Sequence, residues 1–345
     1  MAKIKGAVKS FGLPRIIIAM FLASLFVLGG IYKIPTSSSI NDVIVRFGMN
    51  GILVLSMIPM IQSGCGLNFG IPVGIIGGLL GAVISLELGV TGLPGILVAI
   101  LLAIIFSSAF GVLYGLLLNR VKGEEMIVAT YIGFSFVALM NIMWLVLPFR
   151  NPSSVQGFKG EGLRVTISVE DYWIKAISNI LKIEVNRYFT IPTGMLLLFV
   201  IMSLLVWLFF KTKTGTAITA VGSNHEYARA AGINVDKMRI IATALSTAIA
   251  SVGIIAYQQS FGFIQMFNAP NSFMLPSVAA ILLGGASVNK ATIVNVVVGT
   301  FLFQGILTMT PTVINSIVQV DVSEIVRIIV SNGMIVYALT RKSNV

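Results

Sequence analysis

Long apolar runs separated by short polar stretches dominate the pattern of this chain. A bilayer core is about 30 Å thick, and a helix needs about 17 to 25 mostly apolar residues to cross it. Runs of that length recur throughout and predict an all-α polytopic membrane protein with about ten transmembrane helices in one domain, residues 1–345. The expected spans are 15–32, 43–62, 69–90, 94–118, 126–148, 191–210, 238–258, 271–287, 291–310 and 323–340.

Composition agrees with this class. The chain is 57% hydrophobic and only 10% charged, whereas soluble domains carry about a quarter charged residues. An ordinary soluble domain is therefore excluded.

Lysine and arginine in the loops predict the orientation, because basic loops stay in the cytoplasm. With the N-terminus inside, the inner segments hold most of the basic residues, and the short outer loops hold only Lys33. Both termini and residues 211–237 are then cytoplasmic, and residues 149–190 are extracytoplasmic. This bias accounts for the net charge of +11 without nucleic-acid binding. The inner residues are Lys3, Lys5, Lys9, Arg15, Arg120, Lys122, Lys211, Lys213, Arg229, Lys237, Arg239, Lys290, Arg341 and Lys342.

Residues 211–237 form the one strongly polar run on the expected inner side. Ser223 and Glu226 have the spacing of a capping box, and Gly232 supplies a left-handed stop. These signals predict a helix of about two turns. So short a polar helix is marginal in water and has no core of its own, so it needs a partner surface. The capping pattern alone leaves two interpretations open, a docking element and a solvated loop with one capped turn.

Residues for chemistry on a substrate are scarce. Cys65 is the only cysteine and His225 the only histidine, which rules out an internal disulfide and leaves neither residue the companions of a metal or catalytic site. The phosphate-binding loop GxxxxGK[ST] needs a Gly-Lys pair, which the sequence lacks. The chain is therefore not expected to be an enzyme.

Charged residues inside the spans bear on ion-coupled transport, which usually places acids in mid-membrane. Arg46, Glu87, Glu324 and Arg327 all fall towards expected outer ends. Glu324 and Arg327 are three residues apart and can meet on one helix face. This favours surface anchoring over a proton relay.

Small residues mark two spans for close helix packing. The stretches 66–82 and 274–286 are both rich in glycine, and aligning Pro72 with Pro276 superposes a few further residues. The two spans are separated by an odd number of crossings, so inverted repeats would place them in opposite directions. Ordinary small-residue packing is the alternative.

Residues 169–181 in the outer segment carry apolar side chains at helical spacing: Trp173, Ile174, Ile177 and Leu181. The pattern predicts an amphipathic helix. It either receives another protein or lies in the outer headgroup region with Trp173 as an anchor.

Several motifs together resemble a known family. Thr214-Gly215, residues 220–235, residues 278–287 and Gly299-Thr300 are similar to the permease subunits of bacterial ABC importers of the ribose, simple-sugar and nucleoside group, with branched-chain amino acid permeases as more distant relatives. The chain departs from the family at residues 288–290, where a glycine pair is common, and at 66–74, which lacks an acidic residue often found there. The resemblance favours docking for the polar run and implies these ATPase-coupling residues: Gly222, Ser223, Asn224, Glu226, Ala228, Arg229 and Gly232.

The resemblance also implies partners and a location in the bacterial cytoplasmic membrane. Two permease subunits, identical or homologous, would enclose a pathway, two ATPase subunits would bind ATP and Mg, and an extracytoplasmic binding protein would deliver the solute. This chain would bind membrane lipid and hold no cofactor. A simple sugar such as a pentose is the first expectation for the solute and a nucleoside the second, with an amino acid or a vitamin further back.

Polar residues inside the spans are mostly uncharged, which suits a neutral, hydroxyl-rich solute. Asn50, Asn68, Asn141 and Gln304 are the candidates for lining the pathway, although such side chains also bridge packed helices. Two other classes of function stay open, an ion-coupled secondary transporter and a non-transporting scaffold subunit. The first would import solute with this chain alone, and the second would move none with its partners present.

Overall fold

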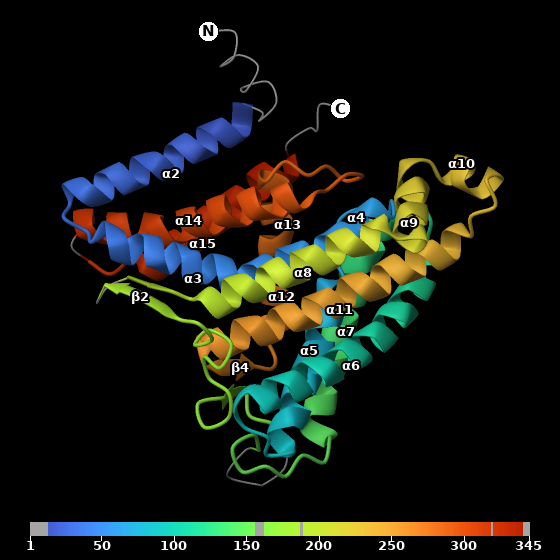
Figure 1. Cartoon of the computed structure of the whole chain (residues 1–345), viewed down its shortest axis with the longest axis horizontal. Coiled ribbons are helices and arrows are strands. Elements are labelled where there is room, and N and C mark those ends of the chain that lie inside the picture. The colour runs from blue at the N-terminus through green and yellow to red at the C-terminus, as the bar shows by residue number, and fades with distance from the viewer. Residues whose placement is uncertain (1–12, 156–161, 187–188, 319, 341–345) are drawn as a thin grey trace.

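The computed structural model describes residues 13–155, 162–186, 189–318 and 320–340. The terminal basic residues used for orientation, Lys3, Lys5, Lys9, Arg341 and Lys342, lie outside these ranges. Helices make up most of the described chain (Figure 1). In its first half they are α2 (Leu13–Ile31), α3 (Thr36–Leu55), α4 (Met57–Gln62), α5 (Ile71–Glu87), α6 (Gly92–Arg120) and α7 (Glu125–Val146). The second half contains α8 (Thr193–Lys211), α9 (Lys213–Ser223), α10 (His225–Ala230), α11 (Val235–Phe261), α12 (Ala269–Ser272), α13 (Met274–Leu283), α14 (Ile293–Val318) and α15 (Ser323–Thr340).

Seven helices of the described chain are long and apolar enough to cross a membrane, with α3 and α4 counted together. They are α3–α4, α6, α7, α8, α11, α14 and α15. Three shorter apolar stretches, α2, α5 and α12–α13, occupy the other expected spans. The protein is therefore a helical polytopic membrane protein, and the expected number of ten crossings stays a prediction.

The first long span is interrupted at Ser56, between α3 and α4. Pro59 follows three residues later, and a proline cannot donate the amide hydrogen bond that a continuous helix requires.

Helix α5 lies at the centre and buries almost every side chain. Its glycines allow two neighbours to approach closely: a Cβ at Gly74 would lie 2.6 Å from the carbonyl oxygen of Thr247 in α11, and one at Gly81 would lie 2.5 Å from the backbone nitrogen of Ala103 in α6. Both distances are far below an ordinary carbon contact of about 3.5–4.0 Å. The expectation of close small-residue packing in this span is confirmed.

The second glycine-rich stretch packs in a different way. Gly284 lies against α14, where a Cβ would come within 2.7 Å of the carbonyl carbon of Asn295. Aligning Pro72 with Pro276 also pairs Gly81 with Gly285. Gly285 has a left-handed φ of 87° just beyond the end of α13, whereas Gly81 lies within a continuous helix. The aligned glycines thus have different local structures, and inverted repeats remain a prediction.

Four short strands tie down the outer segment. Strand β1 (Thr166–Ser168) pairs antiparallel with β4 (Phe263–Gln265), directly after α11. Strand β2 (Ile183–Asn186) pairs antiparallel with β3 (Phe189–Ile191), directly before α8. The first pairing fixes residues 166–168 against the end of α11, and the second lies directly before α8.

The prediction of an amphipathic helix at residues 169–181 is wrong. The chain forms successive turns there, and Lys175 and Leu181 have left-handed φ values of 51° and 52°, which a right-handed helix cannot contain. Trp173 is 1% exposed and packs beside Gly95 of α6. The indole is therefore part of the protein core, so it does not anchor the segment in lipid headgroups.

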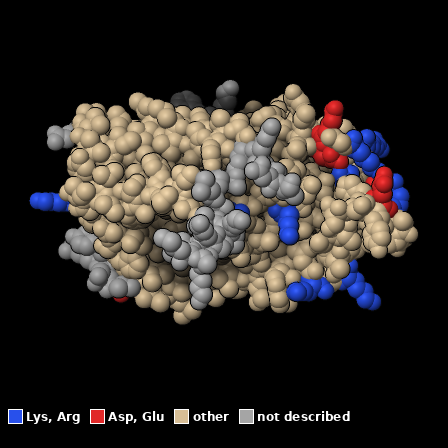
Figure 2. Space-filling model, turned by 90° about the horizontal axis from the view of Figure 1, so that it is seen from above, with Lys and Arg blue, Asp and Glu red and all other residues tan. Residues whose placement is uncertain are grey.

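The outer segment and the polar run lie at opposite ends of the bundle. Helix α8 connects β3 to α9, and α11 connects α10 to β4, so each helix places a strand at one end and the polar run at the other (Figure 1). Charged side chains gather at the α9–α10 end, while most of the remaining face is uncharged (Figure 2). This arrangement fits the expected placement of the two segments on opposite sides of a membrane.

Candidate functional site

The polar run folds as two short helices, α9 and α10. Thr212 caps α9, because its Oγ1 accepts a hydrogen bond from the Gly215 amide at 3.2 Å. Asn224 caps α10, because its Oδ1 accepts from the Tyr227 amide at 2.9 Å. Each cap satisfies an amide that has no partner inside its helix.

The prediction that Ser223 caps the helix in a box with Glu226 is wrong. Helix α9 begins early, after Thr212, and continues through Ser223. Ser223 therefore has a helical backbone, and its hydroxyl donates back to the Thr219 carbonyl at 2.9 Å. The cap moves one residue on to Asn224, whose backbone is extended, as an N-cap requires.

The predicted left-handed stop at Gly232 is confirmed, with φ 79°. The Gly232 amide donates to the Arg229 carbonyl, and the Ile233 amide donates to the Ala228 carbonyl, both at 3.0 Å. This pair of bonds is a Schellman motif. It ends α10 after six residues, close to the expected two turns.

The polar run has a small apolar cluster of its own, contrary to expectation. Val221, Ala228 and Val235 are buried against one another, with Ile233 and Met238 packed beside them. These three residues are seven positions apart in the sequence, and this regular spacing could have indicated the cluster. The cluster joins α9, α10 and the start of α11 into one unit.

This unit packs directly on the turn after α4. A Cβ at Gly222 would lie 2.8 Å from the carbonyl carbon of Gln62 and 3.0 Å from the Gly64 amide nitrogen. Gly64 has φ 76°, and a Cβ there would lie 2.5 Å from the His225 ring. The Gln62 side chain also donates to the Ala291 carbonyl at 2.6 Å, just before α14. The end of α9 is thus in backbone contact with a turn that reaches two transmembrane elements.

Two ion pairs attach the other side of the unit. Asp236, in the first turn of α11, pairs with Lys122 at 3.0 Å, and its carbonyl accepts from the Asn119 side chain at 2.9 Å. One turn further on, Arg239 pairs with Glu125 at the start of α7, with side-chain exposures of 3% and 14%.

Arg239 also donates through Nε to the Cys65 sulfur at 3.1 Å. Burial raises the pKa of the Cys65 thiol, and the nearby guanidinium only partly opposes that shift. The thiol is therefore neutral. Sequence reasoning missed this cluster because its partners are more than a hundred residues apart.

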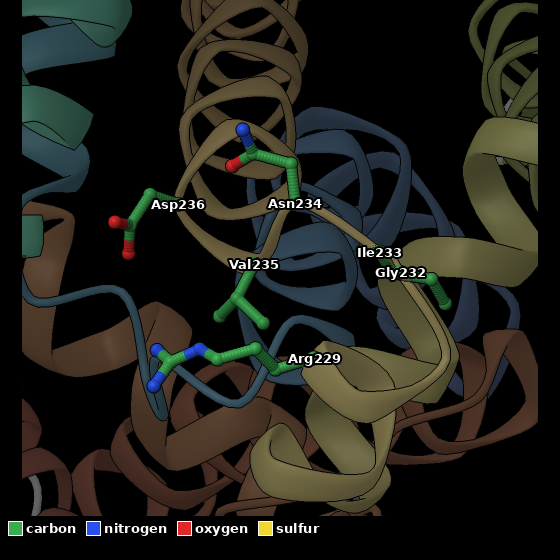
Figure 3. Close-up of a pocket in the computed structure, with 6 residues that line it drawn as sticks. All are labelled: Arg229, Gly232, Ile233, Asn234, Val235 and Asp236. Atoms are coloured by element: carbon green, nitrogen blue, oxygen red, sulfur yellow. The ribbon is translucent and has the colours of Figure 1, made fainter.

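The exposed side of the unit carries charged and aromatic groups. Glu226 and Arg229 are exposed, and Tyr227 is 73% exposed. A hollow of about 290 Å³ lies between the end of α10 and the start of α11. Figure 3 shows its lining residues, Arg229, Gly232, Ile233, Asn234, Val235 and Asp236. The seven predicted coupling residues thus lie together, with Ala228 facing inward and Gly222 against the turn.

The four predicted pathway residues are dispersed. Asn68 is fully buried, donating to Ser246 Oγ at 2.7 Å and accepting from Tyr114 at 3.2 Å. Gln304 is buried in α14. Asn50 is half-buried and donates to the Arg46 carbonyl at 2.9 Å. Asn141 has a buried Oδ1 with no hydrogen-bond partner among the described residues.

Asn68 belongs to a polar network that joins packed helices. Ser246 of α11 donates to the Ser56 carbonyl at the α3–α4 interruption, at 2.5 Å. Ser107 of α6 and Ser251 of α11 bond to each other at 3.0 Å. Many polar side chains in these spans therefore hold helices together, the alternative that the sequence left open.

Known proteins match parts of the chain. It is 29% identical over 133 residues to the autoinducer 2 import system permease protein LsrC of Photorhabdus laumondii, which covers 37% of this chain and 39% of that protein. It is 28% identical over 128 residues to the probable ABC transporter permease protein YphD of Escherichia coli, covering 35% and 38%. The chain thus matches about two fifths of the length of these relatives. No solved structure matches it.

A family model matches far more of the chain. It is described as branched-chain amino acid transport system / permease component and covers residues 39–339. That range includes α4 to α14 and nearly all of α3 and α15. The chain therefore belongs to the branched-chain amino acid transport system / permease component family.

Proposed function

We propose that this chain is the membrane permease subunit of an ATP-driven importer in the bacterial cytoplasmic membrane. ATPase subunits dock on α9 and α10, and ATP with Mg binds to those subunits. A second permease, identical or homologous, completes the pathway, and an extracytoplasmic binding protein delivers the solute.

The observation that carries this proposal is the construction of the α9–α10 unit. It is capped at both ends and presents Glu226, Tyr227 and Arg229 outward. Its base contacts the turn at Gln62 through Gly222, and ion pairs join the start of α11, which belongs to the unit, to Lys122 and to the start of α7. A unit fixed to several helices can transmit a force applied to its exposed side, whereas a freely solvated loop cannot.

The solute that we propose is small and hydroxyl-bearing. A pentose or related simple sugar comes first, a nucleoside next, and the names of the LsrC relatives add autoinducer 2. Asn50, Asn68, Asn141 and Gln304 remain the proposed polar contacts along its route. Asn50 has the strongest support of the four, because it lies on the same face of α3 as the exposed charged residues Asp42 and Arg46.

The test is copurification of the chain from its own membranes, followed by reconstitution with the ATPase and binding protein that accompany it. We expect ATP-dependent uptake, and we expect Glu226→Lys to abolish the coupling of hydrolysis to uptake without affecting insertion. Glu226 is exposed in the first turn of α10, so reversing its charge changes the docking surface rather than the core.

Glu170→Lys is the matched control, because Glu170 is also exposed but lies in the outer segment at the opposite end. Equal uptake by the wild type and Glu226→Lys would contradict docking at α10. Uptake by vesicles that contain this chain alone would instead support an ion-coupled transporter. Absence of any movement with all partners present would support a scaffold.

A further inference from the structure

Charged and amide side chains form a stripe along α3. Asp42, Arg46 and Asn50 recur every four residues and therefore share one face of the helix. Asp42 and Arg46 are exposed and Asn50 is half-buried. At 1.5 Å per residue, Asn50 lies about 20 Å along the helix from Thr36. The stripe therefore continues to a depth where a lipid-facing polar group is costly.

Helix α15 carries a second stripe of the same kind. Glu324 and Arg327 form an ion pair at 2.6 Å, with side-chain exposures of 66% and 49%, which confirms that they meet on one helix face. Ser331 follows one turn later and is half-buried. Exposed apolar residues of α15, such as Ile329, lie on other faces of the same helix.

Tyr257 of α11 connects the two stripes. Gly253, one turn before Tyr257, lies against Leu53 of α3, and Val43 of α3 belongs to one apolar cluster with Val330 and Met334 of α15. Its ring packs edge-on against Phe273 at 4.7 Å and stacks with Phe261 at 5.5 Å. Tyr257 lies four residues before the end of α11 that carries β4, so the stripes meet at the end of the bundle opposite α10.

The two stripes carry no net charge. Arg327 is paired with Glu324, and Arg46 lies one turn from Asp42 on the same helix. Arg46 forms no ion pair within 4.0 Å in the described chain, so its guanidinium keeps donors available. The guanidinium groups donate and the carboxylates accept hydrogen bonds, which suits hydroxyl groups, because these both donate and accept. An aromatic ring beside them suits the apolar face of such a solute.

We propose that the two stripes, Asp42, Arg46 and Asn50 on α3 and Glu324, Arg327 and Ser331 on α15, form with Tyr257 one wall of the water-filled outer half of the pathway, and that this wall contacts an uncharged, hydroxyl-bearing solute. The proposal rests on the proposed function as a permease, because a scaffold would have no pathway. It also changes the interpretation of Glu324 and Arg327, which the sequence placed in surface anchoring.

Cysteine accessibility tests the wall without knowledge of the solute. The single native cysteine, Cys65, is buried, so the background is low. Asn50→Cys and Ser331→Cys are made in the full chain in right-side-out vesicles and treated with a membrane-impermeant sulfonate methanethiosulfonate. Leu204→Cys and Ile329→Cys are the controls, because these side chains are 51% and 65% exposed but apolar. Thiol counting on the washed membrane fraction after denaturation gives the amount of each variant in the membrane.

We expect both wall cysteines to react at least about tenfold faster than the controls, because only a thiol in water ionises and meets the reagent. Ser331→Cys changes a single atom and keeps the test valid if Asn50→Cys misfolds. Wall cysteines as slow as the controls would overturn the proposal and assign this face to lipid.

A second reagent tests the class of solute. An ammonium methanethiosulfonate is compared with the sulfonate at Asn50→Cys, where no charge has been removed. If the wall carries no net charge, the ratio of the reaction rates of the two reagents should be close to the ratio measured for a free thiol in water. A charged pathway would instead favour the reagent of opposite charge by about tenfold or more. Such a preference would overturn the uncharged solute. Neither measurement involves the ATPase, so failure here is distinct from failure of docking at α10.

Discussion

Gly222 gives the sharpest test of how the α9–α10 unit is connected to the membrane helices. Gly222→Ala adds one methyl group to a helical position whose φ is ordinary. The new Cβ would lie 2.8 Å from the Gln62 carbonyl carbon and 3.0 Å from the Gly64 nitrogen. Because ordinary carbon contacts are about 3.5–4.0 Å, the two backbones must separate by roughly 1 Å.

Two opposing effects decide the outcome. Alanine favours the helix over glycine by about 0.8–1.0 kcal/mol, whereas forcing an extra methyl group into a packed contact costs about 1–3 kcal/mol. The second effect acts only at the contact with the turn. We therefore expect a nearly unchanged melting temperature together with a loss of coupling of about 1–2 kcal/mol, which is roughly tenfold.

The assay is uptake per ATP hydrolysed in proteoliposomes that contain the chain, its ATPase and its binding protein. Gly30→Ala is the matched control, because Gly30 is also helical and a Cβ there meets nothing within 4 Å. If Gly222→Ala retains full coupling while its insertion and stability match the wild type, the contact with Gln62 transmits nothing and the reasoning is refuted.

Three further outcomes follow from the same end of the molecule. Arg239→Leu should destabilise the detergent-solubilised protein by about 3–5 kcal/mol, because it leaves Glu125 partly buried and unpaired; the double variant with Glu125→Leu should recover much of the loss in a thermal melt, and no recovery would mean that the pair is not the cause. Cys65 should resist a maleimide at pH 8 until the protein unfolds, because its raised pKa keeps the thiol neutral as the pH rises; rapid labelling of the folded wild type would contradict its burial. Tyr227→Cys, at a position that is 73% exposed, should react with an impermeant maleimide only in inside-out vesicles, and labelling in right-side-out vesicles would reverse the predicted orientation.

Hydropathy predicted the helical membrane class because apolar length is a local property of the sequence. The runs at 94–118, 126–148 and 191–210 became α6, α7 and α8 with ends close to those expected. The stop at Gly232 was predictable for the same reason, because a left-handed turn favours glycine whatever surrounds it.

Features that depend on distant partners were not predictable in this way. Trp173 looked like one face of a helix, but pairing of β1 with β4 and the turns after it direct the indole into the core. The cap moved from Ser223 to Asn224 because α9 continued, and both residues are good caps in isolation. Arg239 counted only as a loop charge, since nothing local indicates that Glu125 and Cys65 meet it.

The glycines of α5 have a consequence for motion. With backbone atoms of α6 and α11 seated in the gaps where side chains would stand, these three helices have no compressible layer between them. A pull on Asp236 or Arg239 at the foot of α11 would displace all three as a single rigid block. Any change in shape during transport would then take place at the contacts between that block and its other neighbours.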